Sequence, residues 1–230
     1  MRKFLSMLLA LTATASLAFA ATETVDCGGS ATLNANPKTG YHFVRWEKDG
    51  VQVSTSASYQ VTNIQADASY TAIFAPNTNT LYTVKHYQQN LDGTYPAVAT
   101  DVDNLTGITG APTAAEAKSY TGFTKVNFDQ GTIAADGSTV ITINYTRNTY
   151  ALSWVTDGDV LTGAYTSGQV LYGATITAPN TPTKIGYTFA GWTPVTSATM
   201  PAEATTYTAT WNPATVHYTV KHWQQNLAND

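Results

Sequence analysis

The feature that most constrains this chain is that one of its segments occurs twice. Residues 82–91 read YTVKHYQQNL and residues 218–227 read YTVKHWQQNL, with one substitution in ten positions and a period of 136 residues. A match of this length does not arise by chance, and it predicts an array of small structural units instead of one large core. The second copy stops three residues later, at Asp230, so we expect residues 217–230 to be the truncated start of a second unit of this kind.

A weaker pattern divides the rest of the chain into three. A glycine followed by an aromatic-rich stretch occurs at GYHFVRW (40–46), GFTKVNF (122–128) and GYTFAGW (186–192). Each is followed by a second stretch that ends in an aromatic residue, at YTAIF (70–74), VITINY (140–145) and YTATW (207–211). We therefore predict three modules, here called the first, middle and third, at residues 21–75, 81–146 and 150–212. Each leading glycine is expected at a chain reversal with positive φ.

The alternation within these stretches is typical of strands, because side chains on a strand point to opposite faces with period two. Tyr41 and Phe43 should therefore share one face, and Trp46 should end the strand on the other face. The same spacing recurs at residues 187–192. Modules of about 60 residues have little core, so a few large aromatic side chains must supply much of it.

Composition favours the same fold class. The chain has 41 Thr, 14 Tyr, 5 Trp and 7 Phe, and these β-branched and aromatic residues are typical of strands. One helix candidate, residues 112–118 (PTAAEAK), combines alanines with Thr113 as a possible cap. The predicted class is mainly β, with at most a short helix in each module. Short Pro/Asn/Thr-rich linkers join the modules, which we expect to stack end to end.

The first 20 residues have the pattern of a secretory signal peptide. Arg2 and Lys3 precede an apolar run, and an Ala-Phe-Ala site predicts cleavage after Ala20. Removing the two basic residues leaves 9 Lys and Arg against 15 Asp and Glu, a net charge of about −6 that disfavours nucleic-acid binding. No later stretch is long and apolar enough to insert in a membrane, so we expect an extracellular or cell-surface chain.

The single cysteine, Cys27, cannot form a disulfide within the chain. It precedes a Gly-Gly turn and a stretch, residues 31–33, that resembles a strand. We interpret it as a half-buried strand thiol, with an intermolecular disulfide as the alternative.

Candidates for catalysis or metal binding are few. The four histidines, His42, His86, His217 and His222, are expected to be structural or solvent-exposed, because no nucleophile or second base accompanies them. Two acidic stretches could hold Ca²⁺, at 101–104 (DVDN) and 157–159 (DGD), but neither supplies a full ligand set, and we interpret both as turns. Residues 92–94 (DGT) and 136–138 (DGS) are predicted hairpin turns. We expect no catalytic residue, metal or cofactor.

Aromatic side chains and strand edges are the remaining candidates for binding. Trp154, Tyr165 and Trp223 lie outside the repeated glycine-aromatic pattern, and we expect them to pack in cores or between modules instead of contacting a ligand. Long Thr-rich strands offer a second route, in which an exposed sheet edge pairs with a partner strand.

The quoted motifs resemble known bacterial repeat families. Residues 27–74 are similar to a divergent internalin-type B-repeat, and residues 150–211, with TPTKIGYTFAGW, resemble the Listeria-Bacteroides repeat of surface proteins. The segment 82–145 looks like a mucin-binding-protein-like module. The resemblance implies small β-grasp-like repeats in exported or wall-attached proteins, acting as stalks or adhesive modules without catalytic residues. The chain shows neither the leucine-rich repeats of internalins nor a sorting motif.

These observations predict a secreted or cell-surface repeat protein that acts by spacing and by multivalent weak contacts with glycans, mucin or surface proteins. The ligand-binding residues are unknown from sequence, and the middle module is the predicted glycan contact. Two alternatives stay open. The modules could be accessory to a secreted hydrolase or protease encoded further along the same frame, or they could be a structural spacer without a ligand.

Overall fold

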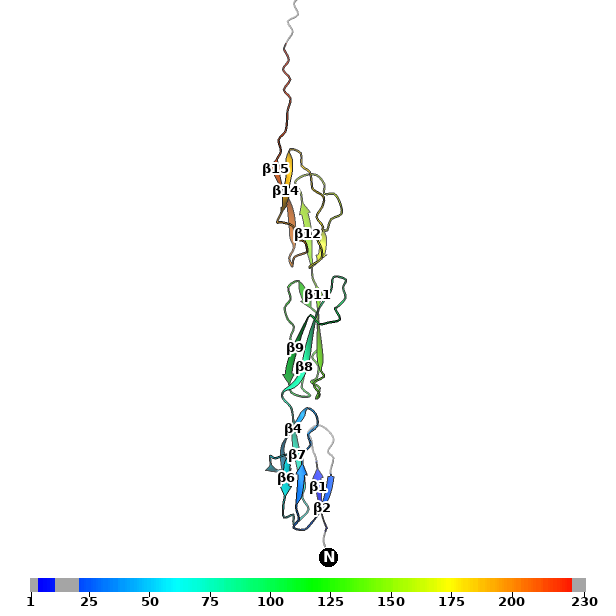
Figure 1. Ribbon diagram of the computed structural model, residues 1–230, viewed down its shortest axis with the longest axis vertical. Helices are drawn as coiled ribbons and strands as arrows, with labels where there is room; N and C mark the ends of the chain where they lie inside the picture. Colours follow the sequence, from blue (N-terminus) through cyan, green and yellow to red (C-terminus); the bar gives the residue numbers. More distant parts are fainter. Residues whose placement is uncertain (1–3, 11–20, 225–230) are drawn as a thin grey trace, which may run out of the picture. The chain divides into compact units, whose positions relative to one another are not determined.

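The structure, a computed structural model, describes residues 4–10 and 21–224 (Figure 1). Every regular element in this part of the chain is a β-strand, which confirms the mainly β prediction. It contains no helix that could cross a membrane. The predicted cleavage site after Ala20 and the last residues of the second repeat copy lie outside the described residues.

The first module is built on a five-stranded sheet in the order β2-β1-β7-β4-β5. Strand β1 runs parallel to β7, and the other neighbours are antiparallel. The strands of this sheet are β1 (Phe4–Ala10), β2 (Ala21–Asp26), β4 (Tyr41–Lys48), β5 (Val51–Ser54) and β7 (Ser69–Pro76). A separate antiparallel pair consists of β3 (Ala31–Asn34) and β6 (Ser58–Val61).

The middle segment forms a four-stranded sheet in the order β10-β11-β8-β9. Its strands are β8 (Thr80–Gln88), β9 (Asp101–Gly107), β10 (Phe123–Lys125) and β11 (Val140–Arg147). The Thr83 amide donates to the Thr139 carbonyl, and the Gln89 amide donates to the Tyr145 carbonyl. From the first bond to the second, the residue number rises by the same amount on both strands, so β8 and β11 are parallel.

The third segment forms another four-stranded sheet, in the order β13-β12-β15-β14. Its strands are β12 (Thr149–Val155), β13 (Gly168–Leu171), β14 (Tyr187–Thr193) and β15 (Thr205–Pro213). Strand β12 is parallel to β15. All three sheets thus share one strand order. In each module, the first strand in sequence lies between the second strand and the last strand, and it is parallel to the last strand. The strand that follows the repeated glycine lies on the other side of the last strand.

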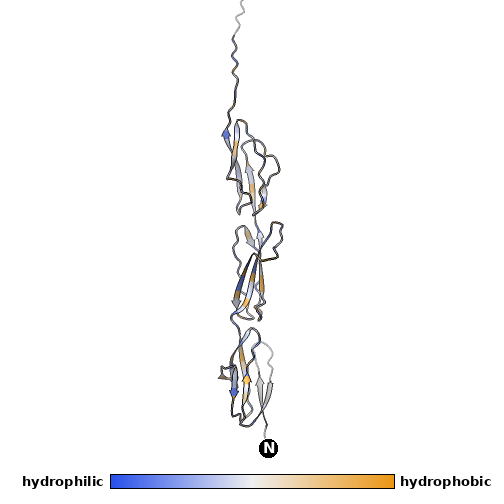
Figure 2. Cartoon of the chain, in the orientation of Figure 1, coloured by the Kyte–Doolittle hydropathy of each residue, from blue (hydrophilic) through white to orange (hydrophobic). Residues whose placement is uncertain are grey.

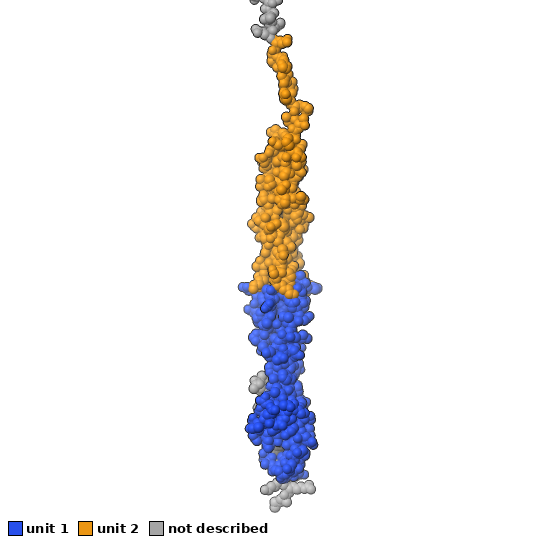
Figure 3. All heavy atoms as spheres, turned by 90° about the vertical axis from the view of Figure 1, so that its left-hand side faces the viewer, with its two compact units in different colours: residues 1–87, 98–117, 127–143 blue, residues 88–97, 118–126, 144–230 orange. Residues whose placement is uncertain are grey.

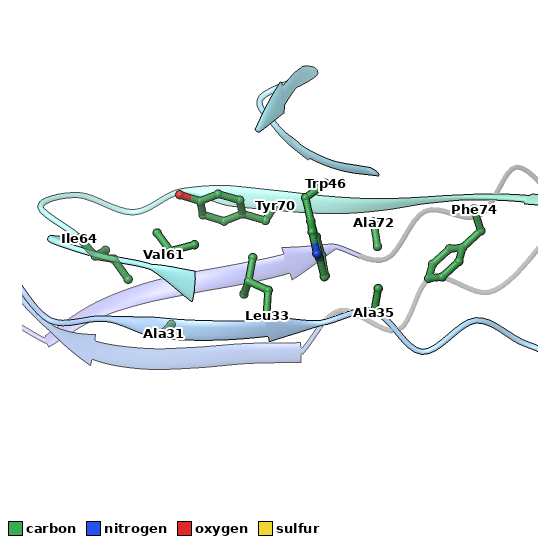
Figure 4. Close-up of a cluster of buried hydrophobic side chains, with 9 residues drawn as sticks. All are labelled: Ala31, Leu33, Ala35, Trp46, Val61, Ile64, Tyr70, Ala72 and Phe74. Atoms are coloured by element: carbon green, nitrogen blue, oxygen red, sulfur yellow. The ribbon is translucent and has the colours of Figure 1, made fainter. Parts of the chain in front are cut away.

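Aromatic and aliphatic side chains fill the core of the first module (Figure 4). Trp46 is fully buried at its centre. Phe43 lies 5.7 Å from the Trp46 ring and 6.0 Å from the Phe74 ring. The buried set is Ala31, Leu33, Ala35, Trp46, Val61, Ile64, Tyr70, Ala72 and Phe74. Buried residues alternate with more exposed ones along strands such as β3 and β7, because successive side chains point to opposite faces. Figure 2 shows polar and apolar residues mixed along the strands.

The prediction that the strand-ending tryptophans face away from the preceding aromatics is wrong. Phe43 contacts Trp46, and Phe189 contacts Trp192 with 5.4 Å between ring centroids. The reason is a register shift in both strands, between Phe43 and Arg45 and between Phe189 and Gly191. Such a bulge inserts one unpaired residue and reverses the face of everything beyond it.

The predicted helix at residues 112–118 is also wrong, and with it the α+β part of the fold prediction; the β-grasp-like detail gains no support. Side chains satisfy this segment's backbone groups instead of helical hydrogen bonds. The Gln130 side chain accepts from the Ala115 amide and donates to its carbonyl, at 2.9 and 2.8 Å. The Ala114 amide donates to the Tyr82 hydroxyl. These bonds hold the segment in an irregular path, and tertiary contacts override its helix propensity.

The repeated glycines confirm the prediction of positive φ. Gly40, Gly122 and Gly186 have φ values of 81°, 79° and 80°. By contacts, the chain divides into two compact units, coloured in Figure 3. One unit comprises residues 1–87, 98–117 and 127–143, and the other comprises residues 88–97, 118–126 and 144–230.

The buried position of Trp46 predicts a large loss of local stability when its side chain is removed. Trp46→Ala should cost about 3–5 kcal/mol, because the ring leaves a cavity among rigid strands. Hydrogen exchange of the β4 and β7 amides should then accelerate by at least about a hundredfold. The β15 amides serve as an internal standard in the same sample.

Gln52→Ala is the matched control, since Gln52 is exposed on β5. It should leave exchange in β4 and β7 unchanged. Equal protection in Trp46→Ala and the native chain would show that this ring does not hold the core together.

Candidate functional site

The four histidines differ in their burial and in the side chains that they contact. His86 is fully buried, and its Nε2 lies 3.1 Å from Asp103 Oδ2. His42 is exposed, with its Nδ1 3.1 Å from Asn77 Oδ1. His217 and His222 are exposed. The structural or solvent roles predicted for these residues are compatible with this placement.

The two acidic stretches behave differently from one another. Residues 101–104 lie on strand β9, so the prediction of a turn is wrong there, and Asp101 Oδ1 accepts from the Val102 amide at 2.8 Å. Residues 157–159 do form a bend after β12, where Asp157 pairs with Lys184 Nζ at 2.5 Å and Asp159 accepts from the Thr183 hydroxyl. Across residues 4–10 and 21–224, no three His, Cys, Asp or Glu side chains gather as a metal site.

The predicted Asp-Gly turns are present between antiparallel strands. Asp92 Oδ1 accepts from the amide and the hydroxyl of Thr94, at 2.9 and 2.6 Å. Asp136 accepts from Ser138 in the same way, at 3.0 and 2.6 Å. In both turns the hydroxyl is the main reason why the pKa of the carboxyl group lies below its usual value. These carboxylates therefore act as turn formers, each with its Oδ1 engaged by two donors of the same turn.

Cys27 is not the half-buried strand thiol that the sequence predicts. Strand β2 ends at Asp26, and Cys27 is exposed in the turn that follows. The Gly29 amide closes this turn on the Asp26 carbonyl at 2.8 Å. The thiol donates to Gln65 Oε1 at 3.4 Å.

The three aromatic candidates divide between core and surface. Trp154 packs in the third core, 4.7 Å from Tyr207 and 4.9 Å from Trp192, which confirms its predicted packing role. Tyr165 is 38% exposed and Trp223 is 88% exposed, so the packing prediction is wrong for both. The described part of the second repeat copy, residues 218–224, forms no strand.

The most developed polar arrangement lies where one module meets the next, at residues that sequence reasoning missed. At the first junction, the Asn77 amide donates to the Gly40 carbonyl at 2.8 Å, and the Thr109 amide donates to the Asn77 carbonyl at 2.9 Å. One linker residue therefore connects the two modules through its own backbone. The Asn77 side chain also meets His42, two residues after the glycine.

The second junction repeats this arrangement. The Asn148 amide donates to the Gly122 carbonyl at 2.9 Å, and the Tyr172 amide donates to the Asn148 carbonyl at 2.9 Å. The Thr124 hydroxyl, again two residues after the glycine, donates to Asn148 Oδ1 at 2.7 Å. After the third module, the Ala214 amide donates to the Gly186 carbonyl at 2.8 Å, so the first half of the pattern occurs a third time.

Arg147 adds side-chain contacts at the second junction. Its guanidinium donates to the Tyr172 carbonyl at 2.8 Å and to the Gln89 carbonyl at 2.9 and 3.1 Å. The same group lies 4.7 Å from the Phe123 ring centroid and 5.9 Å from that of Tyr172. A planar group with several donors can make all these contacts at once, which a lysine ammonium cannot.

The second feature with binding potential is the outward side of the middle sheet, here called the open face. It contains Leu81, Thr83, Lys85 and Tyr87 of β8, Val102, Asn104 and Thr106 of β9, and Val140 and Thr142 of β11. The Thr83 hydroxyl donates to Asn104 Oδ1 across the strands at 3.3 Å. Hydroxyl and amide groups such as those of Thr83 and Asn104 can bind polar ligands such as sugars.

The repeated glycines allow a controlled test of the junction. A Cβ added at Gly122 would lie 2.2 Å from Tyr172 Cδ1, whereas one added at Gly186 would meet nothing within 4 Å. Because both residues have nearly the same positive φ, the backbone strain of alanine is shared. We expect Gly122→Ala to lower the melting temperature by several degrees more than Gly186→Ala.

Thermal unfolding of the two variants, followed by calorimetry, measures this difference. Equal shifts would mean that the contact between Gly122 and Tyr172 contributes nothing to stability.

Comparisons with known families agree with the resemblance drawn from the motifs. Residues 8–78 match the divergent InlB B-repeat domain, and residues 150–216 match the Listeria-Bacteroides repeat domain. The matched ranges leave residues 79–149 uncovered, and the likeness of that segment to mucin-binding modules stays a prediction. A comparison with curated proteins finds no significant match. The two family matches, in the first and third modules, support the assignment of this chain as a bacterial repeat protein.

Proposed function

We propose that this chain is a non-enzymatic, exported repeat region that acts as a stalk and presents weak adhesive contacts at the bacterial surface. The observation that carries this proposal is the junction pattern, in which one linker residue is hydrogen bonded to both neighbouring modules. A chain whose only task was to carry independent domains would not need such bonds. The matched families, which are repeat domains and not catalytic ones, support the same function.

The stalk function follows from how the junctions restrict motion. A linker of a few residues with free backbone groups lets neighbouring domains rotate. At the second junction, Asn148 and Arg147 together fix the approach of the third module's Tyr172 to the middle module's Gly122 and Gln89. Such bonds would restrict rotation at a junction and so limit the range of spacings between contacts on successive modules. This spacing is what multivalent binding requires.

The adhesive function is assigned to the open face of the middle sheet. Its polar side chains, among them Thr83, Asn104 and Tyr87, suit glycans or mucin better than an apolar partner. Each such contact is weak, so clustering of several chains or modules supplies the useful affinity. A spacer without any ligand is the second candidate, and the hydrogen bonds at the junctions support it as strongly as they support an adhesive stalk.

The stalk function predicts that Arg147→Lys loosens the second junction. Lysine loses the paired hydrogen bonds and the stacking on Phe123, so about 1–3 kcal/mol of junction energy should be lost. NMR relaxation of the full chain should then show the third module tumbling faster than in the native chain. Arg45→Lys is the control, because Arg45 forms an ion pair with Glu47 on its own strand, β4, away from the second junction.

Identical tumbling times for Arg147→Lys and the native chain would contradict the proposed coupling. A change of the same size in Arg45→Lys would point to a general loss of structure instead of a junction effect.

The adhesive function predicts that the full chain, biotinylated and tetramerised on streptavidin, binds a mucin-coated surface or a glycan array. Thr83→Ala with Asn104→Ala should weaken this binding by on the order of tenfold, because two hydrogen-bonding groups are lost. The matched control is Ser153→Ala with Thr206→Ala, which removes an exposed cross-strand pair from the third module, where the two hydroxyl oxygens lie 2.8 Å apart.

Binding of the tetramer at the level of a blank surface would remove the adhesive function and leave the spacer. Equal losses of binding in the two double variants would show that binding does not depend on the open face.

A further inference from the structure

The first module contains a pocket of about 230 Å³ that shares no residue with the open face or with either junction. It is formed by the end of β4, the end of β6, the start of β7 and the irregular segment 62–68 that joins β6 to β7. Its polar lining comes from Lys48, Asn63, Gln65, Asp67 and Tyr70. Lys48, Asn63 and Gln65 are exposed, so a solute can reach the pocket from solvent.

The feature that points to a ligand is the hydroxyl group of Tyr70. Tyr70 is 4% exposed, and its hydroxyl forms no hydrogen bond among the groups that the structure describes. Figure 4 shows this oxygen directed away from Trp46, toward the end of the core where Val61 and Ile64 lie. A buried hydroxyl without a partner is unfavourable, because it has lost its hydrogen bonds with water. A molecule bound in the pocket would supply the missing bond.

The third module contains the equivalent tyrosine with its hydrogen bond formed. Tyr70 and Tyr207 are equivalent, since each lies two residues before the alanine that pairs with the strand-ending tryptophan. Tyr207 is 1% exposed, and its hydroxyl accepts from the Ser197 amide at 2.9 Å. The repeat therefore normally satisfies this hydroxyl from within, and the first module does not.

The difference arises in the segment that precedes Ile64. The carbonyls of Ile64 and Met200 accept the same hydrogen bond, from a glycine with positive φ in each module, so these two residues are equivalent. Three residues earlier, the third module has Ser197 and the first module has Val61. Val61 lies on β6, which pairs with β3, whereas Ser197 lies in no strand. The first module thus has a strand where the third module supplies an amide to its tyrosine.

The other side chains of the pocket offer both donors and acceptors. Gln65 Nε2 donates to Asn63 Oδ1 at 2.5 Å, which leaves Asn63 Nδ2 available as a donor. Lys48 Nζ lies 5.9 Å from the centroid of the Tyr70 ring. Lys48 and Asp67 contribute opposite charges, so the lining has no net charge. Burial raises the pKa of the Tyr70 hydroxyl above its usual value, so this group is neutral at physiological pH and can donate as well as accept.

We propose that this pocket binds a single neutral sugar unit. Its volume of about 230 Å³ lies below the roughly 300–1,000 Å³ of pockets for drug-sized ligands, which suits one sugar ring. Each sugar hydroxyl both donates and accepts, as the mixed lining requires. A polar lining without net charge disfavours an apolar or a strongly charged ligand. The proposal goes beyond the stalk and the open face, because it assigns a separate site to the first module.

The test titrates glucose, galactose and N-acetylglucosamine into the full chain and follows the backbone amide chemical shifts by NMR. We expect the shift changes to gather at residues 48 and 61–70. They should saturate in the millimolar range, because so small a ligand offers few contacts. Glucuronate differs from glucose by a carboxylate group and should bind no more tightly than glucose.

Two tyrosine variants form a matched pair. Tyr70→Phe removes the hydroxyl that we assign to the ligand, so the affinity for the sugar should fall by about tenfold. Tyr207→Phe removes the equivalent hydroxyl of the third module and should leave this affinity unchanged. Without sugar the order reverses. Tyr207→Phe should lower the melting temperature by a few degrees because the bond from Ser197 is lost, whereas Tyr70→Phe should not lower it.

Three results would overturn the proposal. The first is that no shift changes gather at residues 61–70 with any of the three sugars at about 100 mM, which would mean that water alone fills the pocket. The second is equal sugar affinity in Tyr70→Phe and the native chain. The third is a preference of about tenfold or more for glucuronate over glucose. None of these results bears on the open face, which the tetramer experiment tests separately.

Discussion

The parallel pairing of the first and last strands at the centre of each sheet is the constraint on which the rest of the structure depends. It requires the chain to enter a module at one end of the sheet and to leave at the opposite end. The middle strands must then lie outside this pair, which gives the common order seen three times. Because the last strand ends beside the repeated glycine, the linker residue that follows reaches that glycine's carbonyl, and the junctions follow from the strand order.

The three repeated glycines share one conformation but differ in their surroundings. Gly40, Gly122 and Gly186 have the same backbone conformation, but only the first two face a close neighbour. At Gly40 an added Cβ would lie 2.6 Å from that of Ala135, and at Gly122 it would meet Tyr172. Glycine is thus required by φ at all three positions and by close approach at two of them.

The sequence predicts the strands, their aromatic cores and the glycine turns, because period-two alternation and turn chemistry are local properties. It does not predict the bulge that turns Trp46 toward Phe43, since an extra unpaired residue leaves no mark at Val44. In the third module the glycine at position 191, inside a strand pattern, is a sequence signal for such a bulge, and the register shifts there. The false helix at residues 112–118 arose because its competitors, the Gln130 and Tyr82 side chains, are distant in sequence. The junction residues Asn77 and Asn148 were treated only as linker composition, although each follows its module's last strand by a single step.

The central parallel pair also determines how a module responds to mechanical load. Tension on the chain pulls the start of β12 and the end of β15 in opposite directions along the strand axes, because the two strands run the same way side by side. The ladder between them is loaded in shear, so its hydrogen bonds must rupture together instead of opening one after another. A chain with a single cysteine cannot resist stretching through internal disulfides, and this geometry supplies resistance to force from backbone pairing alone.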